Sequence, residues 1–218
     1  MKPDVKVCCI KSAEEAAMAI DYGAQALGLV GPMPSGPGIL SLDAIRDISR
    51  TIPTHINSFY LTSKTEFDAI AVEYEWVLTS HIQLTDYTSE NTRLALRKNF
   101  PDLQIVQVIH VSENSRMDDI KSAEKHTDLL LLDSGMPKAK KKQLGGTGQT
   151  HDWAISRKIV QKTSLPVYLA GGILAGNVQE AVLTVKPFGI DLCSGLRSRD
   201  KLDPSKLKAF FDVLARIA

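Results

Sequence analysis

Short apolar segments alternate with amphipathic segments along the whole chain, eight times in succession. Apolar runs of this length between turn residues are typical of strands that are buried on both faces of a sheet. The predicted strands are 5–10, 26–30, 55–61, 81–84, 103–109, 129–133, 167–170 and 189–194. The predicted helices are 13–22, one that opens at Ser41, 65–74, 89–99, 116–125, 153–161, 177–185 and 204–217.

Two local patterns mark where predicted helices begin. Ser12 with Glu15, and Ser63 with Glu66, have the spacing of a capping box, in which the first and fourth residues satisfy each other's backbone N–H groups. Gly23 closes the first helix, and residues 31–38 contain too many glycines and prolines for a helix or a strand. The pattern is therefore one of strand, loop and helix, repeated.

Strands that alternate with helices imply parallel strands joined by crossovers, because both faces of the sheet must be covered. Eight such units in 218 residues favour a single-domain (β/α)8 TIM barrel that spans residues 1–218. A doubly wound open sheet is the alternative that the pattern alone leaves open.

Composition narrows the classes of partner. The chain is 44% hydrophobic and 23% charged with a formal net charge of +1, so no overall field attracts nucleic acid or a membrane surface. The first residues lack the apolar core and cleavage site of a signal peptide, and no apolar run is long enough to span a bilayer. We therefore expect a cytoplasmic protein without nucleic-acid or membrane partners.

The three cysteines give no pattern of paired residues. Cys8 and Cys9 are adjacent, and Cys193 is far along the chain, so we expect reduced cysteines and no disulfide framework. Cys9, on the opposite face of the first strand from Cys8, and Cys193, inside the last strand, are interpreted as packing residues.

Glycine gathers at the ends of the last three predicted strands, in 145–148, 170–172 and 193–195. Barrel enzymes commonly bind a phosphate there through backbone N–H groups, and glycine lets the backbone approach the anion. Each segment taken alone is more simply a tight turn. The predicted phosphate-binding residues are Gly146, Gly148, Gly171, Gly172, Ser194 and Gly195. The basic run 138–142 is interpreted as a solvated loop rather than an anion site.

An ordered set of motifs extends over nearly the whole chain. They are Lys6-Val7-Cys8-Cys9-Ile10, Gly23-Ala24-Gln25-Ala26-Leu27-Gly28, Leu131-Leu132-Asp133, Gly145-Gly146-Thr147-Gly148 with Asp152-Trp153, Leu169-Ala170-Gly171-Gly172 with Asn177-Val178, and Gly189-Ile190-Asp191 with Ser194-Gly195. In this order they resemble the phosphoribosylanthranilate isomerases of tryptophan biosynthesis. The resemblance implies a barrel that binds a phosphorylated sugar-amine substrate and isomerises it without a cofactor.

The resemblance also implies two catalytic groups. An Amadori rearrangement needs an acid to open the furanose ring and a base to remove a proton from the adjacent carbon. By resemblance the base is Cys8, with a thiol pKa lowered by nearby positive charge, and the acid is Asp133. From the residues alone, Cys8 is more simply a small buried strand residue and Asp133 a capping residue. His81, His110 and His151 lack metal-ligand spacing, so no metal is expected.

The departures from the family gather on the aromatic-acid side of the expected site. The loop 31–38 lacks the usual arginine, the usual Gln-Leu-His-Gly reads Gln-Leu-Thr-Asp at 83–86, and Cys9 replaces a glycine. Arg197 and Arg199 are then candidates for a replacement cation that binds the substrate carboxylate. The alternatives are a paralogue that acts on another phosphorylated amino sugar and a non-catalytic phosphate-ligand-binding barrel. A monomer or a homodimer is expected.

Overall fold

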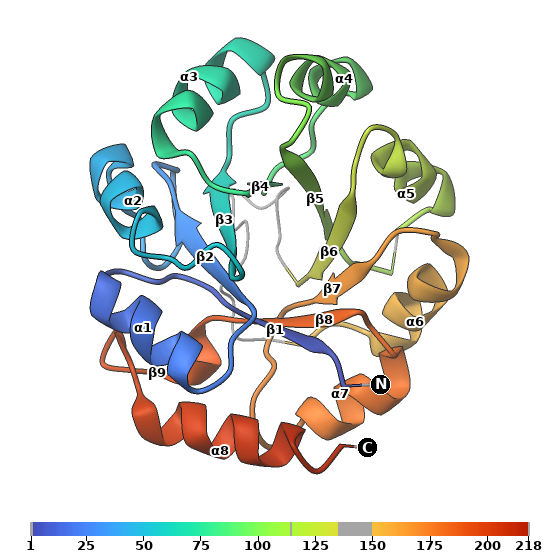
Figure 1. The fold of residues 1–218 in the computed structure, drawn as a ribbon. Helices are drawn as coiled ribbons and strands as arrows, with labels where there is room; N and C mark the ends of the chain where they lie inside the picture. The colour runs from blue at the N-terminus through green and yellow to red at the C-terminus, as the bar shows by residue number, and fades with distance from the viewer. Residues whose placement is uncertain (1, 114, 135–149, 218) are drawn as a thin grey trace.

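The computed structural model describes residues 2–113, 115–134 and 150–217, and its centre is a closed barrel of parallel strands (Figure 1). The strands are β1 (Asp4–Val7), β2 (Ala26–Val30), β3 (Asn57–Thr62), β4 (His81–Leu84), β5 (Gln104–His110), β6 (Leu129–Asp133), β7 (Val167–Leu169) and β8 (Gly189–Leu192). Each strand pairs with the next in sequence, and β8 returns to pair with β1. The predicted barrel is confirmed, because β1 and β8 pair with each other and leave no edge strand, as an open sheet would.

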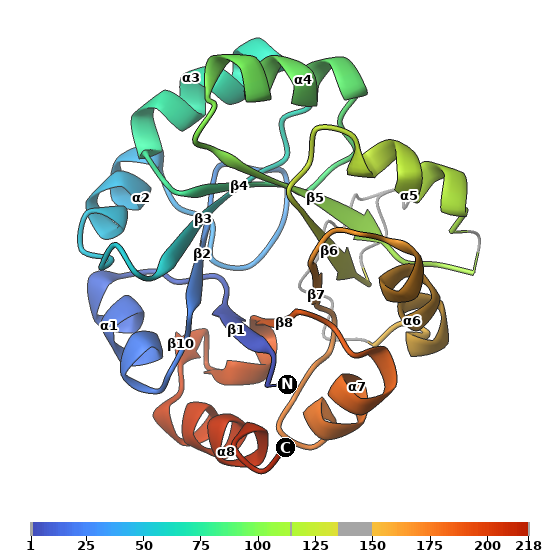
Figure 2. The ribbon, with the colours of Figure 1, turned by 45° about the vertical axis from the view of Figure 1, so that its right-hand side comes forward.

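The α-helices form a ring outside the strands, as both ribbon views show (Figure 1, Figure 2), and the described residues contain eight of them. They are α1 (Ala13–Asp21), α2 (Leu42–Ser49), α3 (Phe67–Val77), α4 (Glu90–Asn99), α5 (Met117–Glu124), α6 (Trp153–Lys162), α7 (Val178–Val185) and α8 (Pro204–Leu214). In the part of the chain described, none of these helices is long and apolar enough to cross a membrane.

The two predicted capping boxes have different outcomes. Ser12 accepts a hydrogen bond from the backbone N–H of Glu15 at 3.3 Å, so α1 begins where the sequence predicts. The second prediction is wrong, since α3 begins at Phe67 and Glu66 lies at its N-cap without a side-chain capping bond. Only half of the first box forms as predicted, because the Glu15 carboxylate accepts from the N–H of Lys11, at 3.0 Å, instead of that of Ser12.

The core consists of two layers. One fills the space between the barrel and the helices, and the other fills the barrel itself with apolar side chains such as Phe59, Val106 and Tyr168. The rings of Phe59 and Tyr168 lie 6.1 Å apart inside the barrel. Packing of this kind makes the barrel a solid core rather than a channel, so a ligand can enter only from a rim.

The ends of β1 and β8 differ from the prediction. Both strands are shorter than expected, ending at Val7 and Leu192, and Cys9 adopts a left-handed conformation with φ of 63°. Val7 lies opposite Leu192 in the parallel register, so the residues that follow emerge side by side.

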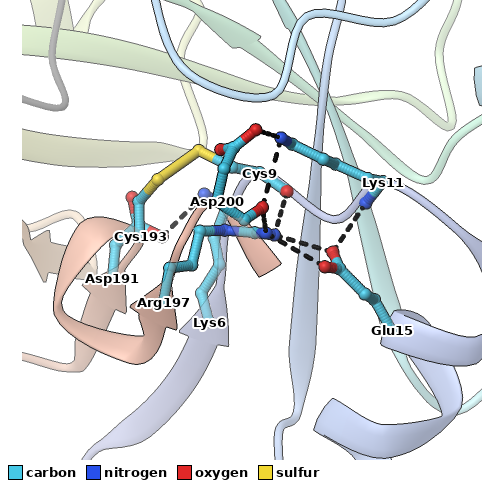
Figure 3. Close-up of a disulfide and its surroundings, with 8 residues drawn as sticks. All are labelled: Lys6, Cys9, Lys11, Glu15, Asp191, Cys193, Arg197 and Asp200. Carbon is cyan, nitrogen blue, oxygen red and sulfur yellow. Dashed lines mark hydrogen bonds and ion pairs between the residues drawn. A yellow bond between two sulfur atoms is a disulfide. The ribbon is translucent and has the colours of Figure 1, made fainter. Parts of the chain in front are cut away.

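This turn brings Cys9 and Cys193 together as a disulfide, with their Cα atoms 5.9 Å apart (Figure 3). The expectation of reduced cysteines that only pack is therefore wrong for these two residues. Cys8 is the remaining free cysteine.

The disulfide predicts a redox-dependent stability. The bond spans 184 residues of sequence, and removal of a native disulfide commonly lowers the free energy of unfolding by roughly 2–5 kcal/mol. We expect dithiothreitol to lower the melting temperature of the wild-type protein. The Cys9→Ser/Cys193→Ser double variant should melt near the temperature of the reduced wild-type protein, and dithiothreitol should not change that temperature.

Thiol counting supplies the direct check. Alkylation of the unfolded protein without reductant should modify Cys8 alone, whereas alkylation after reduction should modify all three cysteines, as read by intact mass. The Cys8→Ser variant is the control, because it keeps the disulfide and should remain sensitive to reductant. Three modified cysteines without reductant would contradict the bond.

Candidate active site

A pocket opens at the carboxyl ends of the strands. Its lining comes from both sides of the barrel and from the loop after β2. The described residues that line it include Cys8, Met33, Gln83, Thr85, Asp133, Gly171, Gly172, Asp191, Ser194 and Gly195. The structure therefore gathers both predicted catalytic residues and four of the predicted phosphate-binding residues around one cavity.

Cys8 lies just beyond β1, with its side chain buried inside the barrel. Its backbone N–H donates to the carbonyl of Leu192 at 2.7 Å, which fixes the residue against the end of β8. Burial raises the pKa of the Cys8 thiol to about 11, although the nearby charge of Lys6 works to lower it. The expectation of a lowered pKa is wrong for this structure, because the cost of burying a thiolate outweighs the attraction of the ammonium.

Asp133 is the last residue of β6 and is also buried. Burial raises the pKa of its carboxyl above the usual value, while the N–H of Ser134, which donates to Oδ1 at 2.7 Å, and the charge of His110 act in the opposite direction. A buried carboxyl with a raised pKa keeps its proton nearer to neutral pH, which is what a general acid requires.

Two charged residues beside Cys8 were not identified from the sequence, the fully buried Lys6 and the mostly buried Asp191. Lys6 Nζ donates to Asp191 Oδ1 at 2.8 Å, and the two residues are partners in the register of β1 and β8. Burial works to lower the pKa of Lys6, but Asp191 and Cys8 together raise it, so the ammonium stays charged. The available indications were the two-residue spacing of Lys6 and Cys8, and a carboxylate within the apolar run of β8.

Gln83 is a further pocket residue whose role the sequence did not indicate. It belongs to β4 and is 4% exposed, yet its Oε1 has no hydrogen-bond partner within the described residues. The neighbouring Thr85 is already satisfied, because its hydroxyl donates to the Thr62 carbonyl at 2.9 Å. A buried amide oxygen without a partner is costly, so Gln83 offers the pocket an open acceptor.

The loops after β7 and β8 form one side of the pocket. Gly171 and Gly172 have φ values of 86° and 63°, a conformation that other residues adopt only with strain. The side chain of Asn177 fixes this loop by donating to the Gly172 carbonyl at 3.0 Å and accepting from the N–H of Leu174 at 2.8 Å.

The loop after β8 packs closely against the loop after β7. A side chain at Gly195 would meet the carbonyl oxygen of Ile173 at 2.5 Å, so only glycine fits. Among the described residues, the backbone N–H groups of Gly172, Ser194 and Gly195 donate to no backbone carbonyl. Gly146, Gly148 and the basic run 138–142 lie outside the described residues.

The two candidate arginines lie away from the pocket lining. The buried guanidinium of Arg197 donates to both carboxylate oxygens of Glu15, at 3.0 and 2.7 Å, and to the carbonyls of Cys9 and Asp200 (Figure 3). Arg199 is exposed in the turn between the short strands β9 (Arg197–Ser198) and β10 (Lys201–Leu202). No lysine or arginine lines the described part of the pocket.

Metal ligands are not gathered in the described residues, where no three His, Cys, Asp or Glu side chains lie together as a metal site would require. His110 Nε2 lies 2.9 Å from the Thr85 carbonyl, and His151 Nε2 lies 2.6 Å from Ser156 Oγ. His81 stacks on Phe59 with the ring centroids 4.2 Å apart. The sequence-based expectation of neither metal nor cofactor stays a prediction.

Comparison with known proteins gives a consistent assignment. Residues 5–213 match the family model described as N-(5'-phosphoribosyl)anthranilate (PRA) isomerase. N-(5'-phosphoribosyl)anthranilate isomerase 2 of Methanosarcina mazei is 37% identical over 88% of this chain and 85% of its own length. The N-(5'-phosphoribosyl)anthranilate isomerase of Nostoc punctiforme is 31% identical over 96% of this chain and 97% of its own length.

Solved structures agree with this assignment. The isomerase from Thermus thermophilus superposes with a TM-score of 0.83 at 25% identity, covering 99% of this chain and 100% of its own. The isomerase from Pyrococcus furiosus gives a TM-score of 0.81 at 26% identity, covering 98% of both chains. With the family model matched over nearly its whole length, this chain belongs to the N-(5'-phosphoribosyl)anthranilate isomerase family.

Proposed function

We propose that the chain converts N-(5'-phosphoribosyl)anthranilate to 1-(2-carboxyphenylamino)-1-deoxyribulose 5-phosphate, with Asp133 as acid and Cys8 as base. The observation that carries these roles is that one pocket contains both side chains beside a glycine-rich rim. The lining combines apolar side chains such as Met33 and Leu61 with polar ones such as Gln83 and Thr85, as a ligand with an aromatic part and a sugar part requires.

The acid step opens the ring. Asp133 donates its proton to the furanose oxygen, the bond from that oxygen to the anomeric carbon breaks, and the amine nitrogen supplies the electrons that form an iminium ion. The raised pKa of Asp133 supports this role, because burial favours the protonated carboxyl that an acid needs.

The base step moves a proton from carbon. Cys8, as the thiolate, removes the proton on the carbon next to the iminium, and the resulting enolamine tautomerises to the amino ketone. A thiol with a pKa of about 11 is mostly protonated at neutral pH, so the base must ionise beside a compensating charge.

Backbone donors support a phosphate position at the rim. The N–H groups of Gly172, Ser194 and Gly195 border the pocket, and groups of this kind bind phosphate oxygens without a cationic side chain. Gly146 and Gly148 complete the proposed phosphate site, together with Gly171. With the phosphate bound here, the sugar extends toward Cys8 and Asp133.

The pocket matches the proposed substrate least well where the carboxylate of the anthranilate would bind. Arg197 is bound to Glu15, which leaves Arg199 as the proposed replacement cation. A pocket lining without a described cation also favours a second candidate function, in which the chain is a paralogue that isomerises another phosphorylated amino sugar.

The cellular location of the protein and its oligomeric state are also part of the proposed function. We propose a cytoplasmic enzyme of one domain, residues 1–218, that acts as a monomer or homodimer without nucleic-acid or membrane partners. Light scattering coupled to size exclusion would distinguish the two assembly states. The disulfide is unusual for a cytoplasmic protein, so thiol counting on protein taken directly from cells tests the location.

The acid and base roles predict a large loss of turnover. Cys8→Ser and Asp133→Asn should each lower kcat by at least ~10²-fold, since a positioned acid or base contributes about 10²–10⁴-fold. The decay of phosphoribosylanthranilate fluorescence measures turnover. Affinity for inorganic phosphate should stay close to wild type in both variants, and near-normal turnover in either variant would remove that residue from the mechanism.

The rim predicts anion binding. Inorganic phosphate should raise the melting temperature of the wild-type protein and inhibit turnover competitively, because backbone donors at the rim bind it. Gly195→Ala should abolish both effects, since the added methyl group would meet the Ile173 carbonyl and displace the loop. Gly176→Ala is the control, because a side chain there meets nothing within 4 Å. Equal phosphate binding in both variants would contradict the site.

The replacement cation predicts a change in KM alone. A charge-assisted hydrogen bond to the carboxylate contributes roughly 1.5–3 kcal/mol, so Arg199→Ala should raise KM for phosphoribosylanthranilate about 10- to 150-fold with kcat unchanged. Lys201→Ala, an exposed lysine of the same hairpin, is the control. If the wild-type enzyme turns over efficiently and Arg199→Ala leaves KM unchanged, Arg199 is not the replacement cation. If the wild-type protein shows no turnover of phosphoribosylanthranilate, the paralogue is favoured.

A further inference from the structure

The interior of the barrel contains a charged pair beside the proposed base. Lys6 is fully buried, although a lysine ammonium is costly to bury without a partner. Its Nζ donates to Asp191 Oδ1 at 2.8 Å and lies 5.1 Å from the centroid of the Phe59 ring. Cys8 directly follows β1, two residues after Lys6, and its side chain lies inside the barrel as that of Lys6 does.

Gly28 on β2 makes room for both side chains. A Cβ atom built at Gly28 would lie 2.6 Å from Cys8 Sγ and 3.1 Å from Lys6 Nζ. The thiol and the ammonium therefore border the same small space, which any larger residue on β2 would fill. The interaction between Lys6 and Cys8 is thus built from three positions on two adjacent strands.

Other charged and titratable groups surround this pair. Asp191 of β8 faces both Lys6 and Cys8, and Asp133 of β6 interacts with Lys6 and Asp191. Tyr168 of β7 interacts with Asp191, and His81 of β4 interacts with Lys6. His81 is neutral at pH 7, because burial lowers its pKa to about 4. Lys6 therefore supplies the positive charge closest to Cys8 among these groups.

We infer that Lys6 is a positioning residue whose ammonium stabilises the thiolate of Cys8, and that Asp191 limits this effect by pairing with the same ammonium. The inference deepens the proposed function, because it rests on Cys8 acting as the base. When Cys8 ionises, its proton leaves through the pocket and the thiolate remains beside Lys6, which keeps its own protons. The strength of the Lys6–Asp191 pair thereby sets how much thiolate forms.

Two substitutions are expected to act in opposite directions. Lys6→Met removes the ammonium, so alkylation of Cys8 by iodoacetamide at pH 8 should slow at least tenfold, and its pH midpoint should rise. Asp191→Asn removes the competing carboxylate, so alkylation at the same pH should become faster. A tenfold change corresponds to one unit in the thiol pKa.

The chain itself simplifies the measurement. Cys9 and Cys193 are joined, so Cys8 is the cysteine that reacts in the folded, non-reduced protein. Lys11→Met is the matched control, since Lys11 lies on the same segment but pairs with Asp200, and its alkylation rate should equal wild type. Circular dichroism confirms the fold of each variant.

Each result has a definite meaning. An unchanged rate in folded Lys6→Met would overturn the inference. If Lys6→Met does not fold, the comparison rests on Asp191→Asn, where an unchanged or slower rate would overturn it. Alkylation reads the thiol directly, so a protein without turnover would contradict the proposed function and leave this comparison valid.

Discussion

Closure of the barrel between β1 and β8 is the constraint on which the site depends. The parallel register opposes Lys6 to Asp191 and Val7 to Leu192, so one strand pairing places the ion pair inside the barrel and Cys8 at the rim. A slip of one residue between the two strands would turn one of these charged side chains toward the helices, where apolar residues pack, and would break the ion pair. The first and last strands are therefore held in register by the same contact that surrounds Cys8 with charge.

The pocket favours neutral groups. Burial raises the pKa of both the Cys8 thiol and the Asp133 carboxyl, so it favours the protonated form of each. A raised pKa suits an acid and opposes a base, so the same burial supports the proposed role of Asp133 and works against the proposed role of Cys8. The charge of Lys6 acts against this effect at Cys8, although burial outweighs it in the free protein.

The fold could be predicted from the sequence because the strands are short, mostly apolar runs and the helices each have one apolar face. Both patterns can be recognised within a single segment of the chain. Cys8 and Asp133 were identified through motifs, which reveal residue types in order along the chain. The Cys9–Cys193 disulfide could not be predicted, because it depends on the left-handed backbone of Cys9 and on the pairing of β1 with β8 that closes the barrel.

Charges that pair across the chain were equally hidden. The sequence suggested Arg197 as a cation that could bind the substrate, yet its guanidinium is bound to Glu15. From the sequence, Glu15 was interpreted only as part of the capping box of the first helix. In the sequence Lys6 is simply a lysine within a predicted strand, and only the structure shows that Asp191 lies opposite it. Such pairs require the register, and no single segment contains that information.

The disulfide also changes the covalent topology of the molecule. Residues 9–193 form a closed ring that contains β2 to β8 and α1 to α7, with β1 and α8 on the two short tails that leave the ring at the same place. One proteolytic cut within that ring opens a loop without releasing a fragment. The two pieces become covalently separate only when the disulfide is also reduced, so protease and reductant are both needed to divide the molecule.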